Sequence, residues 1–409
     1  MPELLYSKKI SLFDKKSVFI GFIIIFFITD SLNLIVDHYP SNFTHLFFTP
    51  YLRLSAYSKG IVFLLMIIYQ IVNKELIFNY VIIYAVFGIN YLLNINEITS
   101  EPSIMWTVQF VKLLFPFLLF DYIKHISRGD FFKIHKILRI IWIVQVIAVA
   151  TGIITGSELF LTYNNYRFGY KGLFVPQNEA TFFYIISCVL EYKIWKDQRK
   201  KIDLFLLIAF FIASVILGSK TSILFLVSFL GFIVWDLNLK NKKHKKYYYV
   251  AIGVIVLIII SIMLSSGLIQ FYVNLANDQG WLYMITSKRS DMISTYLVEY
   301  IRSWNFFNYL LGGCNSPFYF VEMDVVDIFV YSGIIGTFVY LWYLFRQLFL
   351  FSKHNKVGWF LVFQFFLIGG LAGHVFASGI NAIYLVILCY YLQLTDPVHQ
   401  KQNIHQETA

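Results

Sequence analysis

Long apolar runs separated by short polar segments dominate the pattern of this chain. A helix needs about 20 mostly apolar residues to cross the hydrocarbon core of a membrane. The pattern therefore predicts an all-α integral membrane protein of about twelve transmembrane helices, with residues 1–409 forming a single polytopic membrane domain. The predicted helices lie at roughly 17–37, 54–73, 76–93, 104–122, 137–156, 179–195, 202–218, 221–237, 247–266, 326–349, 358–376 and 379–394.

The longest polar interruption is the segment 267–325, between the ninth and tenth predicted helices. Within it, apolar side chains recur at three- and four-residue spacing from Met284 to Trp304, with charged side chains on the other faces. This spacing predicts an amphipathic helix that lies along the membrane surface or caps the bundle.

Composition and charge support a membrane protein and give it an orientation. The chain is 58% apolar and 14% charged, whereas about a quarter of the residues of a soluble domain are charged. Its net charge of +10 does not require nucleic acid as a partner, because most lysines and arginines collect in short loops that alternate along the chain. Such loops face the cytoplasm. Both termini are then cytoplasmic, and the extracytoplasmic segments are 38–52, 94–103, 157–178, 219–221, 267–325 and 377–378.

A few basic residues break this rule by lying on the predicted outer side, so they need another explanation. Arginine and lysine hold phosphate oxygens through charge-assisted hydrogen bonds, which predicts a cationic substrate-binding pocket. The alternative is that these side chains reach up to lipid headgroups or pair with nearby acids. The predicted substrate-binding residues are Arg167, Lys171, Lys220, Arg289 and Arg302.

Three carboxylates, Glu322, Asp324 and Asp327, precede or begin the tenth predicted helix. An acid at a helix N-terminus can simply complement the helix dipole. Three carboxylates are more than this role requires, so we take one of them as a candidate general base. Asp30 and Lys112 are further suspects, because charges within membrane helices are costly.

Other chemistry has little support in the sequence. His374 could relay protons, although a packing role is the simpler explanation. There is no Walker loop, dinucleotide fingerprint or HExxH motif, and the three cysteines form no CxxC. We therefore expect neither a cofactor nor a metal.

A series of short motifs follows in a fixed order between residues 160 and 340. The motifs are an outer loop containing Arg167, Pro176-Gln177-Asn178-Glu179-Ala180, Gly218-Ser219-Lys220-Thr221, Lys288-Arg289, Leu311-Gly312-Gly313, Glu322-Met323-Asp324 and Tyr331-Ser332-Gly333-Ile334-Ile335-Gly336. In these motifs the chain resembles the bacterial O-antigen polymerases and the related O-antigen ligases. Lys220 stands where the family usually has Arg in a Ser-Arg pair, and a lysine does not offer the bidentate contact to phosphate that an arginine does.

The resemblance implies an outward-facing glycosyltransferase of the helical-bundle type in the bacterial inner membrane. Its substrates would be oligosaccharides carried on undecaprenyl diphosphate, and a chain-length regulator would be its partner. Ligases of this superfamily carry a functional His in the large outer loop, whereas residues 267–325 contain none, which favours a polymerase. A ligase, or a flippase of lipid-linked oligosaccharides, remains the alternative, although the long loop counts against a flippase.

Roles for the candidate residues follow from this expectation. Arg289 and Arg167 would bind the diphosphate, supported by Lys171 and Lys220. A clamp of cations can stabilise the charge that develops on a diphosphate leaving group without a metal. The predicted catalytic residues are Arg289, Glu322 as the base for the acceptor hydroxyl, and Asp324 as the residue that orients it.

Overall fold

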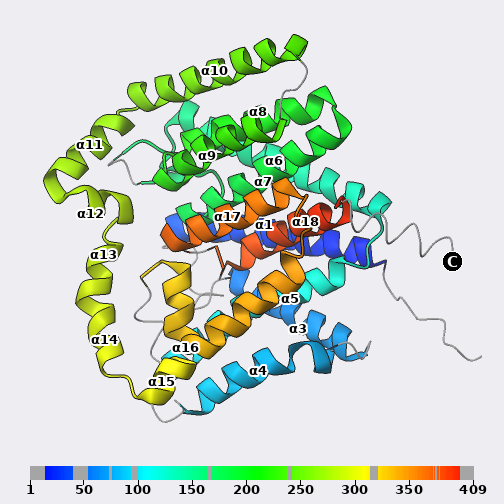
Figure 1. The fold of residues 1–409 in the computed structure, drawn as a ribbon, viewed down its shortest axis with the longest axis vertical. Coiled ribbons are helices and arrows are strands. Elements are labelled where there is room, and N and C mark those ends of the chain that lie inside the picture. The colour runs from blue at the N-terminus through cyan, green and yellow to red at the C-terminus, as the bar shows by residue number, and fades with distance from the viewer. Residues whose placement is uncertain are drawn as a thin grey trace, which may run out of the picture.

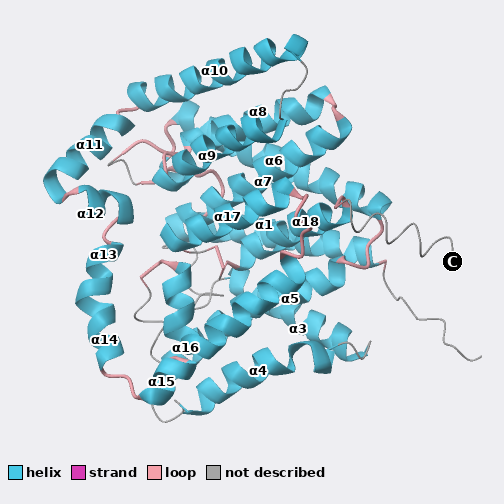
Figure 2. Cartoon of the chain, viewed as in Figure 1, coloured by secondary structure: helices cyan, strands magenta, loops and turns pink. Residues whose placement is uncertain are grey.

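The computed structural model describes residues 14–39, 54–72, 76–93, 100–163, 167–237, 242–313, 321–371, 373, 375–376 and 378–396. Within these ranges the chain forms helices joined by turns and loops, and it contains no strand (Figure 2). The predicted all-α fold class is thereby confirmed.

Each of the twelve predicted apolar runs coincides with a helix. Most of their ends differ from the predicted limits by a few residues and the start of α6 by nine, because polar residues add turns that hydrophobicity does not indicate. The helices are α1 (Lys15–His38), α3 (Leu54–Val72), α4 (Leu76–Leu93), α5 (Ser100–Ile123), α6 (Arg128–Thr155), α7 (Gln177–Gln198), α8 (Lys201–Ile216), α9 (Lys220–Leu237), α10 (Lys242–Ser265), α16 (Asp324–Tyr343), α17 (Lys356–Leu371) and α18 (Gly379–Leu394).

The helices themselves give a smaller number of membrane spans than the predicted twelve. Among the described residues, six helical segments are long and apolar enough to cross a membrane, and a seventh appears if the pair 256–265 and 268–279, bent by 66°, counts as one span. The six are Lys15–His38, Leu54–Val72, Met105–Ile123, Arg128–Thr155, Lys220–Leu237 and Asp324–Leu348. The remaining predicted spans are shorter or more polar, so the length and composition of the helices indicate a membrane protein but do not give the count of twelve.

The most polar of these helices, α7, lies in the middle of the bundle. Every side chain from Ala180 to Tyr192 is buried, and the same holds for Gly379 to Leu392 of α18, which packs against α7 and α5. Protein rather than lipid surrounds α7, so it can carry the buried Glu191, which pairs with Arg139 and His135. A count of membrane spans that is based on hydropathy therefore misses central helices of this kind.

The segment between α10 and α16 forms an arch of short helices along one end of the bundle (Figure 1). The beginning of α1 and the end of α18 lie on the opposite side from this arch. We call residues 267–313 the arch, and the end of the bundle beneath it the arch end. The arch contains α11 (Leu268–Gln279), α12 (Trp281–Thr286), α13 (Arg289–Met292), a π-helical turn Ile293–Leu297, α14 (Val298–Arg302) and α15 (Phe306–Leu311).

The amphipathic helix predicted within the arch is interrupted. Ser287 and Lys288 have φ angles of 54° and 71°, in the left-handed region, which ends α12 before α13 begins. Helical turns then continue from α13 through α14, and their apolar face packs against the start of α16. The contacting side chains include Leu297, Trp304, Val321 and Val330.

A break in α16 holds the end of the arch in place. Gly333 has φ 64° and ψ −168°, and a Cβ at this position would lie 2.4 Å from backbone atoms of Leu310 and Leu311. The Gly313 amide donates a hydrogen bond to the carbonyl of Val330 at 3.2 Å. Only glycine fits both the left-handed angle and this close approach of two backbones.

Candidate functional site

The loop that carries Arg167 folds against the break between α8 and α9. The Tyr170 amide donates to the carbonyl of Ile216 at 3.0 Å. Gly218 has a φ of 69°, and a Cβ there would lie 2.4 Å from the carbonyl oxygen of Phe168. This backbone contact brings Arg167 beside Lys220, the first residue of α9.

Arg167 is held among aromatic rings of the loop and the arch. Its guanidinium carbon lies 3.3 Å from the ring centre of Tyr163, and 5.3 Å and 5.4 Å from those of Phe271 and Tyr272 in α11. Such cation–π contacts fix the orientation of a guanidinium without neutralising its charge. Its buried Nε has no hydrogen-bond partner among the described residues. The group is therefore held in place with one buried donor that no described residue satisfies.

Lys220 joins α9 to the arch. Its ammonium donates a hydrogen bond to the carbonyl of Met284 and lies 5.9 Å from the ring centre of Tyr272, which also contacts Arg167. The positive charges of Arg167 and Arg289 both lie near enough to repel this ammonium. Three cations from separate parts of the chain thus converge at the arch end. We call Arg167, Lys220 and Arg289 the cationic site.

Arg289 forms an ion pair with Glu322. Its Nη2 lies 2.8 Å from Glu322 Oε2, and its Nη1 donates to the carbonyl of Thr286 at 3.4 Å. The Arg289 side chain is 9% exposed and that of Glu322 is 52% exposed, so the carboxylate is the accessible member of the pair.

Left-handed backbone conformations occur on both sides of this ion pair. Ser287 and Lys288 precede Arg289, and Glu322 itself has a φ of 57°. In the described chain, only Arg199 is a further non-glycine residue with positive φ. A residue in this region costs on the order of 1–3 kcal/mol, and such residues cluster at functional sites.

Other predicted site residues lie apart from the cationic site. The Lys171 ammonium donates to the carbonyl of Val175 at 2.7 Å, within its own loop. Arg302 is exposed at the far end of the helical turns that begin at Arg289, which at 1.5 Å per residue is roughly 20 Å away.

The two aspartates near Glu322 bind backbone groups. Asp324 Oδ2 accepts hydrogen bonds from the amides of Val375 and Phe376 at 2.6 Å and 2.9 Å, and Asp327 Oδ1 accepts one from the amide of Val321 at 2.8 Å. Asp324 therefore anchors the segment before α18. His374 lies outside the described residues.

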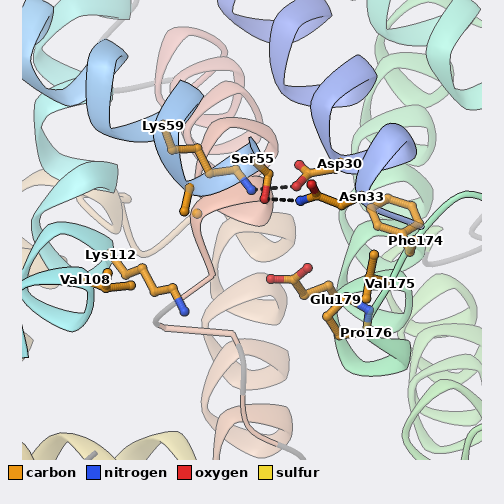
Figure 3. Close-up of a pocket in the computed structure, with 12 residues that line it drawn as sticks. Asp30, Asn33, Ser55, Lys59, Val108, Lys112, Phe174, Val175, Pro176 and Glu179 are labelled. Atoms are coloured by element: carbon orange, nitrogen blue, oxygen red, sulfur yellow. Dashed lines mark hydrogen bonds and ion pairs between the residues drawn. The ribbon is translucent and has the colours of Figure 1, made fainter. Parts of the chain in front are cut away.

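A cavity of about 270 Å³ lies between α1, α3, α5, α7 and α18. Figure 3 shows Lys112 and Glu179 reaching toward it from opposite walls, with the Lys59–Asp30 ion pair, at 2.8 Å, on a third side. Its other lining residues are Asn33, Ser55, Ala56, Val108, Phe174, Val175, Pro176 and Gly379.

Two acceptor atoms in the wall of this cavity are unsatisfied. Asp30 Oδ2 and Asn33 Oδ1 are buried and have no hydrogen-bond donor among the described residues. Leaving a buried acceptor without a hydrogen bond costs about 1–3 kcal/mol of folding free energy, so a bound donor would be favourable at each of these atoms. Sequence reasoning had singled out Asp30 and Lys112 as intramembrane charges, but it gave no signal for Asn33.

Two chain segments connect the cavity with the cationic site. The loop that carries Arg167 continues to Phe174–Pro176 in the cavity wall. The segment before α18 contacts both places, because Ser378 Oγ donates to Glu179 Oε1 at 2.8 Å while a Cβ on Gly373 would lie 2.4 Å from the Glu322 carbonyl oxygen.

Comparison with known protein families, curated proteins and solved structures finds no match to this chain.

The cationic site is suited to an anion with several oxygens. Two guanidinium groups and an ammonium offer more donors than one carboxylate can accept, and charge-assisted hydrogen bonds contribute about 1.5–3 kcal/mol each. Among the described residues, no three His, Cys, Asp or Glu side chains are grouped to hold a metal ion. The arrangement can bind a phosphate or diphosphate beside an accessible carboxylate.

Proposed function

We propose that this protein is a polysaccharide polymerase of the bacterial inner membrane. It would join oligosaccharide repeat units carried on undecaprenyl diphosphate, producing O-antigen or a capsule-type polymer. In this proposal the chain has twelve spans, both termini lie in the cytoplasm, and the arch end faces outward. The activity is that of a glycosyltransferase, with a chain-length regulator as a possible partner in the membrane.

The observation that carries the proposal is the convergence of Arg167, Lys220 and Arg289 beside Glu322. The sequence predicts all four as diphosphate ligands or base. Arg289 lies 2.8 Å from Glu322, and Lys220 lies within the field of both arginines. A diphosphate site with an adjacent carboxylate matches the two needs of glycosyl transfer from a lipid diphosphate.

The proposed reaction is a displacement at the anomeric carbon of the growing chain. The acceptor hydroxyl oxygen forms the new glycosidic bond while the bond from the anomeric carbon to the diphosphate oxygen breaks. Glu322 accepts the hydroxyl proton, and undecaprenyl diphosphate leaves. Arg289 and Arg167 stabilise the negative charge that gathers on the leaving oxygen, because they are already in place and need no reorganisation.

The deciding experiment is a gel of lipopolysaccharide or capsule from a strain that lacks the gene, with a complemented strain as the control. A polymerase defect leaves core that carries one repeat unit, because ligation and transport still occur. Bare core with polymer retained on undecaprenyl diphosphate outside the membrane would instead identify a ligase. Bare core with single units trapped inside would identify a flippase and overturn the proposal.

A further inference from the structure

We propose that the cavity between α1, α3, α5, α7 and α18 is a recognition site for one sugar residue of the lipid-linked oligosaccharide. The inference rests on the proposed function, because it takes the substrate class from it. It adds a second site to the protein, separate from the cationic site that would bind the diphosphate.

The unsatisfied atoms of the cavity define what it can bind. Asp30 Oδ2 and Asn33 Oδ1 require donors, and no described residue supplies one. Asp30 already pairs with Lys59 through its other oxygen at 2.8 Å, so a second cation is not needed to balance its charge. Neutral hydroxyl groups satisfy both acceptors without adding charge to a buried place.

The opposite walls supply complementary groups. Lys112 points into the cavity as a donor, and Glu179 presents a carboxylate that Ser378 holds in position at 2.8 Å (Figure 3). Phe174 and Pro176 add apolar surface to the same lining. A sugar ring matches this mixture, because its hydroxyls both donate and accept while its C–H faces pack against apolar side chains.

The size of the cavity limits the ligand to a short piece of saccharide. About 270 Å³ lies below the range of roughly 300–1,000 Å³ found for drug-sized ligands, so a whole repeat unit does not fit. One residue of the unit would enter while the rest stays outside.

The two connecting segments make this site relevant to the reaction. The loop 167–176 has Arg167 in the cationic site and Phe174–Pro176 in the cavity wall. Before α18, Gly373 lies against the Glu322 backbone, and Ser378 donates a hydrogen bond to the Glu179 side chain. A sugar bound in the cavity would therefore lie beside chain segments that also contact the cationic site and the backbone of the proposed base.

The test uses the purified full-length protein in detergent and saturation-transfer difference NMR. The probe is the repeat-unit oligosaccharide released by mild acid from the lipid-linked intermediates of the strain that carries the gene. It lacks the diphosphate, so its binding does not depend on the cationic site. The variants are Ala56→Leu, which fills the cavity, and Asn33→Leu, which removes an acceptor. Ala150→Leu on the exposed face of α6 is the matched control.

We expect the wild type and Ala150→Leu to bind the probe, and the two cavity variants to bind it at least about tenfold more weakly. Loss in Ala56→Leu alone would support the cavity and remove Asn33 from its recognition set. No signal with the wild type, or unchanged binding in Ala56→Leu, would overturn the inference. Failure of the proposed function shows instead in the gel of the deletion strain, so the two failures are distinguishable.

Discussion

Arg289 Nη2 lies 2.8 Å from Glu322 Oε2, although one residue begins α13 in the arch and the other precedes α16. Burial differs sharply across the pair, at 9% exposure for the Arg289 side chain and 52% for that of Glu322. The guanidinium is thus fixed by protein on most sides while the carboxylate remains open to a ligand. This asymmetry suits a fixed phosphate ligand beside an accessible base.

Arg289→Ala tests the cationic site most directly. Loss of one charge-assisted contact to the leaving diphosphate is expected to slow polymer formation roughly ten- to hundredfold. The measurement is the polymer length distribution on a gel at equal protein level in the membrane. Arg128→Ala is the control, because Arg128 is exposed at the start of α6, where Asp130 pairs with Lys16 at the start of α1. Normal polymer from Arg289→Ala would remove Arg289 from the site.

Glu322→Gln tests the proposed base. The amide keeps the shape of the side chain but cannot accept the hydroxyl proton, so polymerisation is expected to slow about 10²- to 10⁴-fold. The wild-type rate measured with lipid-linked substrate should fall at acidic pH, whereas the rate of the Glu322→Gln variant should not. A residue that only pairs with Arg289 would not produce this difference. Asp291→Asn, an exposed acid on α13, serves as the matched control. An unchanged pH profile would contradict the base assignment.

Arg167→Lys separates the charge of this residue from its geometry. Lysine keeps the charge but loses the planar group that lies 3.3 Å from the Tyr163 ring centre. Because cation–π contacts contribute about 0.5–2 kcal/mol, a two- to thirtyfold rise in KM for lipid-linked donor is expected, with a smaller change in kcat. Arg199→Lys, which alters another stacked arginine at the C-terminal end of α7, should leave KM unaltered.

Gly333→Ala is expected to destabilise the protein. The backbone conformation alone, which is essentially restricted to glycine, costs roughly 1–3 kcal/mol for a residue with a Cβ, and that Cβ would collide with the backbone of Leu310 and Leu311 at 2.4 Å. Thermal unfolding in detergent should show a lower Tm. Gly21→Ala in α1 is the control, because nothing lies within 4 Å of its Cβ position. Equal Tm values for the two variants would contradict the tight contact between α15 and α16.

Arg139→Met should destabilise the bundle without touching the arch. Arg139 Nη2 lies 2.6 Å from both Glu191 Oε2 and Asp203 Oδ1, and these two acids are fully buried. Removing the cation leaves buried carboxylates uncompensated, for an expected loss on the order of 3–5 kcal/mol in unfolding free energy. Lys133→Met breaks the more exposed pair with Asp130 and should cost less than about 1 kcal/mol. Similar losses from both variants would contradict a buried network.

Hydrophobic periodicity predicted the helices well and the membrane crossings less well. Apolar runs mark helices because the preference is local, and every predicted run is a helix. The same runs do not reveal which helices face lipid. The buried α7 can be polar because Arg139 and His135 of α6 bond to its Glu191, a pairing that depends on two helices coming together.

The sequence by itself determined the all-α class and the residue types available for anion binding, because hydrophobicity and charge are properties of single positions. It also singled out Arg167, Lys220, Arg289 and Glu322. Only the tertiary structure decided which of these meet. It also decided that Asp324 binds the backbone before α18, and that Asn33 has an acceptor without a donor. Contacts between distant segments arise from packing and backbone conformation, which no local pattern records.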